Sequence, residues 1–162
     1  MNVEMFYVKT DDRDAVIACI AERLRSQPDA PGMQPDWGLE SCYDVILAKD
    51  PKRKIIMSPL KEGWLGAIES KEALDFALLQ SISERLGAEV IACQLADAIG
   101  ACGYARSSGG ELVEHQWLPG SADPLATLRE YLHLRSVPFD ILTFREAVEL
   151  RSAGWEFVQA LS

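Results

Sequence analysis

The segment "ELVEH", residues 111–115, holds the side chains of this chain whose types and spacing could do chemistry together. On a helix, Glu111 and His115 would share a face at i and i+4 and could bind a metal ion. The surrounding residues instead predict a strand, whose alternation puts Glu111, Val113, His115 and Trp117 on one face and Glu114 on the other. One histidine and one carboxylate make a poor site without ligands from elsewhere. We therefore favour a structural or surface role for Glu111, Glu114 and His115, and we keep them as candidate binding residues.

The four cysteines, at positions 19, 42, 93 and 102, form no C-x-x-C pair. Reduced thiols in the core are the default for such a chain. If the chain turns at Asp97-Ala98 between two strands, Cys93 lies directly opposite Cys102. That pair could form a disulfide or a redox switch, or the two residues could simply be small apolar fillers of the sheet.

Recurrent catalytic motifs are absent from the sequence. There is no G-x-S-x-G elbow, no phosphate-binding loop, no G-x-G-x-x-G and no H-E-x-x-H. A cysteine nucleophile would need a base, and only His115 and His133 could serve. The sequence therefore predicts no catalytic residue, no metal ligand and no cofactor, and it favours a protein that is not an enzyme while leaving an enzyme open.

Tryptophans supply the other candidate binding residues. Residues 26–41, "SQPDAPGMQPDWGLES", contain three prolines and two glycines and predict a long loop around Trp37. Trp37 and Trp155 lie beside glycines in irregular segments, which makes them the better interface candidates. Trp64 and Trp117 fall in predicted strands and belong most simply to the core or its margin.

An antiparallel sheet with helices must position these residues. Apolar alternation and β-rich runs predict strands at 3–9, 42–49, 54–58, 63–68, 89–95, 99–105 and 111–117. Helical spacing predicts helices at 15–24, capped by Thr10 or Asp11, and from Ser70 to 86, ended by Gly87. Asp123-Pro124 starts a third helix and residues 143–146 a fourth. This is an α+β fold: an antiparallel-rich sheet with two helices on one face and the C-terminal helices at an end or edge.

A short phrase occurs twice: "IAERL" at 20–24 and "ISERL" at 82–86. Each copy ends a predicted helix within the order strand, helix, strand, strand, at about 3–58 and 63–105. An internal duplication would explain this. So would local chemistry, because Ile and Leu four residues apart bury on one helix stripe while Glu-Arg faces water.

Length, composition and charge bound the classes of function. With 162 residues and 48% hydrophobic content, the chain predicts a single domain over 1–162. The net charge is −9, and residues 61–162 carry 8 Lys/Arg against 15 Asp/Glu. Such acidity disfavours nucleic acid and anionic membranes and suits a basic partner, although it also serves solubility. Without a visible signal peptide or membrane span, we expect a cytoplasmic protein.

The stretch from Trp64 to Trp117 joins "GWLGAI", "LLQSISERLGAEVIACQL", "IGACGYAR" and "GGELVEHQW". It resembles uncharacterised small bacterial α+β proteins, some of which are similar to immunity proteins of toxin systems. The resemblance implies a non-enzymatic protein that acts by binding, and it implies no particular site residues.

Three hypotheses follow. The first is an immunity-like binding protein whose acidic surface engages a basic protein, for example a nuclease-type toxin. The alternative is a small-molecule-binding domain or enzyme with a pocket beneath loop 26–41, using Glu111, Glu114, His115 and a cysteine. The third is a homo-oligomer that associates through an exposed strand edge or a tryptophan.

Overall fold

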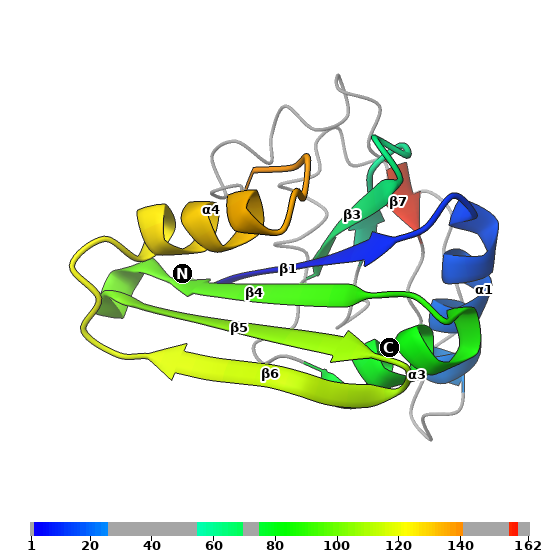
Figure 1. Ribbon diagram of the computed structural model, residues 1–162, viewed down its shortest axis with the longest axis horizontal. Coiled ribbons are helices and arrows are strands. Elements are labelled where there is room, and N and C mark those ends of the chain that lie inside the picture. Colours follow the sequence, from blue (N-terminus) through cyan, green and yellow to red (C-terminus); the bar gives the residue numbers. More distant parts are fainter. Residues whose placement is uncertain (1, 26–54, 70–74, 141–155, 159–162) are drawn as a thin grey trace.

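The computed structural model describes residues 2–25, 55–69, 75–140 and 156–158. These residues form one sheet in which every ladder is antiparallel, and the strand order is β6-β5-β4-β1-β3-β2-β7 (Figure 1). The strands are β1 (Asn2–Lys9), β2 (Ile55–Met57), β3 (Trp64–Glu69), β4 (Val90–Ala96), β5 (Ala101–Ser108), β6 (Glu111–Leu118) and β7 (Glu156–Val158). The helices are α1 (Arg13–Arg25), α3 (Phe76–Leu86) and α4 (Pro124–Leu134), with a 3-10 turn η1 (Asp97–Ile99). The predicted α+β fold is confirmed.

The centre of the sheet has a recognised topology. Elements β1-α1-β2 and β3-α3-β4 give the strand order β4-β1-β3-β2, which is the split β-α-β arrangement of ferredoxin-like folds. Strands β5 and β6 extend it on one side and β7 on the other. The two repeated phrases end α1 and α3, which pack together: Arg85 pairs with Glu22 at 2.6 Å, and Cys19 Sγ lies 4.0 Å from Ser81 Oγ. This layout accommodates a duplication, which itself stays a prediction.

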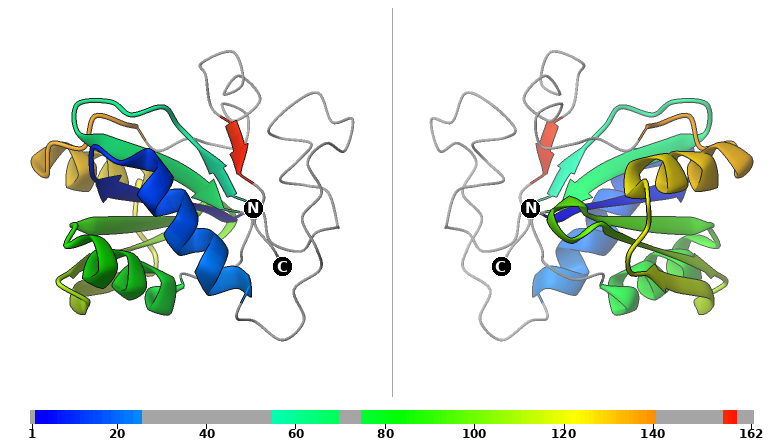
Figure 2. Two further views of the ribbon diagram at one scale, coloured as in Figure 1. Left: turned by 90° about the vertical axis from the view of Figure 1, so that its right-hand side faces the viewer. Right: turned by 90° about the vertical axis from the view of Figure 1, so that its left-hand side faces the viewer.

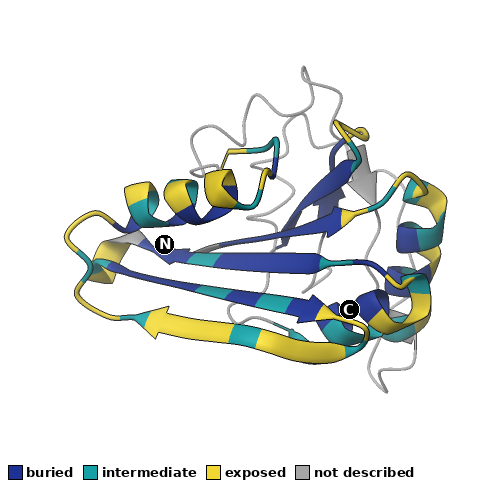
Figure 3. Ribbon diagram, in the orientation of Figure 1, coloured by how far each residue is buried: buried dark blue, intermediate teal, exposed yellow. Residues whose placement is uncertain are grey.

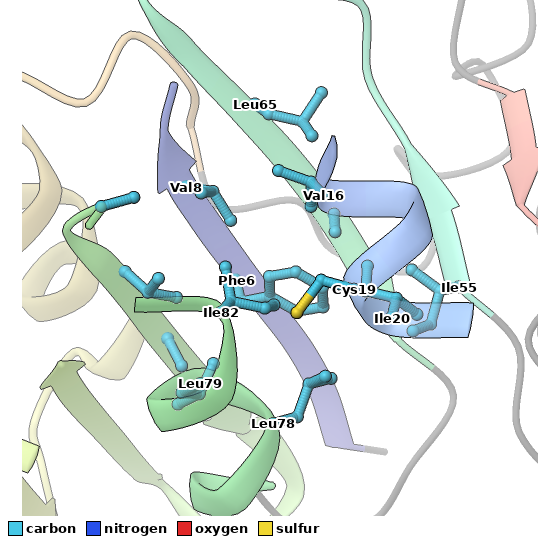
Figure 4. Packing of buried hydrophobic residues seen from close by; sticks show 14 of the residues in the cluster. Phe6, Val8, Val16, Cys19, Ile20, Ile55, Leu65, Leu78, Leu79 and Ile82 are labelled. Carbon is cyan, nitrogen blue, oxygen red and sulfur yellow. The ribbon is translucent and has the colours of Figure 1, made fainter. Parts of the chain in front are cut away.

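One face of the sheet packs against α1 and α3. Alternate residues of β1, Phe6 and Val8, point into a cluster with Ile20 of α1 and Ile82 of α3 (Figure 4). All four side chains are buried. Full burial of side chains this size contributes roughly 1.5–3 kcal/mol each, so this layer is a main source of the fold's stability.

The other face packs against α4. Leu128, Tyr131 and Leu132 of α4 join Met5 and Tyr7 of β1 in a second buried cluster. Figure 2 looks at the sheet from its two ends and shows α4 at the end opposite to α1. The helix predicted from residue 143 lies outside the described residues, as does the strand predicted at 42–49.

Helix termini follow the predicted chemistry at some positions and depart from it at others. Gly87 ends α3 at φ 59°, and Asp123 caps α4 by accepting the Ala126 N–H at 3.0 Å, both as predicted. The cap of α3 is Asp75, not Ser70, because its carboxylate accepts the Leu78 N–H at 3.1 Å. Near the start of α1, Asp12 accepts the Ala15 N–H at 3.0 Å, so it takes the place predicted for Thr10 or Asp11.

The connection between β4 and β5 corrects the predicted cysteine pair. The chain turns through η1 and Gly100, a longer loop than the two residues expected, so Cys102 faces Leu95 and Cys93 faces Tyr104. Both cysteines are buried and free. Diagonal neighbours in a ladder lie roughly 7–8 Å apart, too far for a disulfide without backbone movement.

The β5–β6 connection is the predicted hairpin. Gly109 and Gly110 form a two-residue loop with φ of 59° and 84°, which is the left-handed conformation of a type I′ turn. The tip is anchored on α3, because the Gly110 N–H donates to Ser83 Oγ at 2.9 Å. Beyond the tip the register shifts: Ser107 pairs with Leu112 but Arg106 pairs with Glu114, so Val113 is the extra residue of a β-bulge.

Candidate functional site

Strand β6 forms one of the two edges of the sheet, and it is more exposed than strands β1 to β5. Figure 3 shows it exposed along nearly its whole length, in contrast to the buried strands beside it. Three of its apolar side chains are open to solvent, with exposed fractions of 36% for Leu112, 47% for Val113 and 43% for Trp117. An edge strand presents unpaired backbone groups, and native proteins usually protect it with lysine or proline. Strand β6 has neither.

The β-bulge corrects the predicted alternation of β6. Residues directly opposite each other in an antiparallel ladder share a face, so His115 lies with Ala105 on the α1/α3 side. Glu111 pairs with Ser108 and lies on the α4 side. The predicted pairing of Glu111 and His115 on one face is therefore wrong, because the extra residue Val113 shifts the alternation between them.

On the α1/α3 side, β6 presents an aromatic and apolar surface. The His115 ring meets Phe76 of α3 edge-on, with centroids 4.7 Å apart. The Trp117 ring lies against Gly103 of β5, so closely that a methyl group there would come within 2.8 Å of Trp117 Cε3. Leu112 pairs with Ser107 on the same side. The glycine makes room for the indole to lie flat over the neighbouring strand while its outer part stays in solvent.

On the α4 side, Glu114 is a hydrogen-bond centre. Its Oε2 accepts from Tyr131 Oη at 2.9 Å, from Arg135 Nη2 at 2.9 Å and from Arg106 Nε at 3.4 Å. The Tyr131 ring is held between the Arg135 guanidinium, 3.6 Å from its centroid, and the Tyr104 ring, 3.9 Å away. These contacts tie the end of α4 to β5 and β6. Glu114 therefore serves inside the fold more than toward a partner.

The electrostatics of this centre follow from the same contacts. Partial burial acts to raise the pKa of Glu114, but the hydrogen bond from Tyr131 and the charge of Arg135 outweigh it, so the pKa is lowered from its ordinary value. Burial, together with the hydrogen bond to Glu114, raises the pKa of Tyr131. The site is thus a carboxylate, two arginines and a neutral phenol, a structural network with no free base.

The residues proposed for a catalytic pocket do not converge. His115 lies on the α1/α3 side of β6, whereas Glu111 and Glu114 lie on the α4 side. Cys93 and Cys102 are buried beneath α4, where burial raises the pKa of both thiols. Trp37, Trp155 and loop 26–41 lie outside the described residues. Among the described residues, the histidine, the two glutamates and these two cysteines therefore do not form one site.

A second polar position lies in the α1/α3 layer. Glu4 and Glu69 are buried and directly opposite on β1 and β3, and Gln94 Nε2 donates to Glu4 Oε1 at 3.4 Å. With Asp75 they line a cavity of about 10 Å³, room for about one water molecule. Within residues 2–25, 55–69, 75–140 and 156–158, no three His, Cys, Asp or Glu side chains are placed to hold a metal ion.

Sequence reasoning missed the exposed apolar side chains of Leu112 and Val113 and the role of Gly103. A partial signal was the position of "ELVEHQW" as the last strand of a meander, a place where edge strands are often found. The buried carboxylates of Glu4 and Glu69 were also missed. Charged residues within otherwise apolar strand runs were the signal for them.

Comparisons with known proteins bring no assignment. No family model matches the sequence, and neither a curated protein nor a solved structure matches it significantly. In the part of the chain that the structure describes, no helix has the length and apolar character needed to cross a membrane.

Proposed function

We propose that this protein is a non-enzymatic binding module that engages a basic protein partner at the β6 edge. The observation that carries the proposal is an edge strand exposed along most of its length, with exposed apolar side chains at Leu112, Val113 and Trp117. Scattered exposed apolar residues are ordinary, but several along one strand edge that has no lysine or proline are typical of an interaction surface.

Charge supports a basic partner. Residues 61–162 carry 8 Lys/Arg against 15 Asp/Glu, and the whole chain has a net charge of −9. Such a field speeds the approach of a positively charged protein and weakens as salt screens it. Strand β6 itself has no basic residue and contributes the exposed carboxylate of Glu111, whereas Glu114 is already paired with Arg106 and Arg135. In the immunity-like form of this proposal, the partner is a basic toxin whose activity the complex blocks.

The test is affinity capture of the tagged protein from its native lysate, at about 50 mM and about 500 mM salt. Val113→Lys places a positive charge on the edge. Leu60→Ala is a control because Leu60 is 42% exposed and lies between β2 and β3, which strands β5, β4 and β1 separate from β6. We expect one basic protein to be captured by the wild type and by Leu60→Ala, less at high salt, and not by Val113→Lys. Capture that is indifferent to Val113→Lys would refute the β6 surface.

A further inference from the structure

We infer that the partner contributes an extended segment that pairs with β6 as an eighth, antiparallel strand of the sheet. In this segment apolar and polar residues alternate, and its C-terminal end is basic. This inference rests on the proposed function and states how the partner is recognised. The described part of the chain places β6 at the edge of a sheet whose other ladders are all antiparallel. Main-chain pairing at an exposed edge is a recurrent mode of peptide recognition.

The alternation follows from the two sides of β6. Side chains of an added strand that point to the α1/α3 side would lie beside Trp117 and Leu112, both exposed and apolar. Those that point to the α4 side would lie beside Gln116 and Glu114, which are polar and already hydrogen-bonded to Tyr104 and Tyr131. Since successive residues of a strand point to opposite faces, an apolar residue must alternate with a polar, uncharged one.

The direction of charge follows from the hairpin end of β6. Glu111 begins the strand, and Glu84 of α3 lies beside Gly110, with its Cγ within 3.2 Å of the place a methyl group on that glycine would occupy. Both carboxylate side chains belong to exposed residues. A strand antiparallel to β6 has its C-terminal end at this position. Lysine or arginine is therefore expected there and not at the N-terminal end.

A second copy of this chain fits the edge less well. Laid antiparallel on the first, another β6 would bring the residues around its own Leu118 toward Glu111, and residues 116–122, "QWLPGSA", contain no lysine or arginine. Two molecules of net charge −9 also repel each other. A foreign strand with a basic end complements both the acidic hairpin end and the net negative charge of the chain.

The experiment uses the full chain and a fluorescein-labelled, terminally blocked peptide, Thr-Val-Thr-Val-Thr-Val-Lys-Lys, with fluorescence anisotropy as the readout. The same residues with both lysines at the N-terminus form the charge control. Two further peptides carry N-methyl groups on alternate residues, one on each of the two alternating sets. Only one set points its N–H groups toward β6 in a paired strand.

We expect the peptide with C-terminal lysines to bind at least about tenfold more tightly than its reversed control. Trp117→Ala should weaken the affinity for this peptide about tenfold, whereas Leu60→Ala should change that affinity less than about twofold. One N-methylated set should weaken binding about tenfold and the other should not. Equal effects of the two sets, or no binding of any peptide, would overturn strand addition, yet the capture of a basic protein sensitive to Val113→Lys would still stand. A dimer in sedimentation velocity that Val113→Lys abolishes would also overturn it, since a second copy would then occupy the edge.

Discussion

The hairpin tip that holds β6 in place gives the sharpest stability test, through the substitutions Gly110→Ala and Gly109→Ala. Both glycines have left-handed backbone conformations, with φ of 84° and 59°. A methyl group at Gly109 meets no atom within 4 Å, whereas one at Gly110 would lie 2.9 Å from Glu84 Cβ and 3.2 Å from its Cγ. The two substitutions therefore share the conformational cost and differ in packing.

The expected magnitudes follow from that difference. A non-glycine residue in the left-handed region costs about 1 kcal/mol, which is the whole effect expected for Gly109→Ala. At Gly110, the extra methyl group must also push the hairpin away from α3, and such overpacking typically costs 1–3 kcal/mol. That displacement lengthens the 2.9 Å hydrogen bond from the Gly110 N–H to the hydroxyl of Ser83, a fully buried residue. Gly110→Ala should thus lower the free energy of unfolding by about 2–4 kcal/mol.

The assay is reversible urea unfolding of the wild type and both variants, followed by tryptophan fluorescence and by circular dichroism. Coincident transitions from the two probes are required before free energies are compared. Gly109→Asn is a further control, because asparagine suits the first position of a type I′ turn and should be nearly neutral. Equal free-energy losses for Gly109→Ala and Gly110→Ala would refute the argument that the tip is docked on α3.

Three further predictions concern the rest of the described structure. Because the pKa of Glu114 is lowered in the folded state, the carboxylate stabilises the fold above its ordinary pKa of 4.5, and this stabilisation is lost as pH falls through the folded-state pKa. Urea unfolding of the wild type between pH 7 and 3 should show this loss. A Glu114→Gln variant with the same acid dependence would contradict the prediction. Cys93 is buried and the pKa of its thiol is raised, so iodoacetamide at pH 8 should alkylate it only when the protein unfolds. Peptide mass spectrometry measures the alkylation, and rapid labelling of the native protein would disprove the burial of Cys93. Asp123→Ala removes the cap of α4 and should cost about 1 kcal/mol of unfolding free energy, whereas Asp123→Asn should cost less; equal losses for the two variants would show that the cap does not act through its side-chain oxygen.

Much of the fold could be predicted from local patterns in the sequence. Strand runs such as "VEMFYVK" and "EVIACQL" are recognisable from their content of β-branched and other apolar residues. Gly87 and Asp123-Pro124 have helix-end chemistry that depends on few neighbours. The type I′ hairpin at Gly109-Gly110 was likewise predictable, because two consecutive glycines tolerate the left-handed turn that few other residues accept.

Register was the part that local patterns could not provide. The prediction that Cys93 faces Cys102 assumed a two-residue turn, and the 3-10 turn at Asp97–Ile99 shifted the ladder by two. The prediction that Glu111 and His115 share a face assumed an unbroken strand. Loop geometry and bulges are set by how the strands meet the rest of the sheet, and one extra residue reverses every side chain beyond it.

The candidate site could be predicted only in part for the same reason. His115, Glu111 and Glu114 were placed on the correct strand, but the network that engages Glu114 depends on Tyr131 and Arg135, about twenty residues away in sequence. Nothing in the spacing of these residues signals that they meet. The exposure of Leu112 and Val113 depends on the strand order, which the sequence leaves open.

The bulge at Val113 also bears on how freely the protein tolerates insertions and deletions. Without Val113, Leu112 and Glu114 would keep their present partners, Ser107 and Arg106, in one uninterrupted ladder, so the fold would survive the loss of a single codon. The edge, however, would become straighter and more regular, and flat edges invite indiscriminate pairing between molecules. A deletion that is silent in an unfolding experiment should therefore still be visible as light scattering in a concentrated solution.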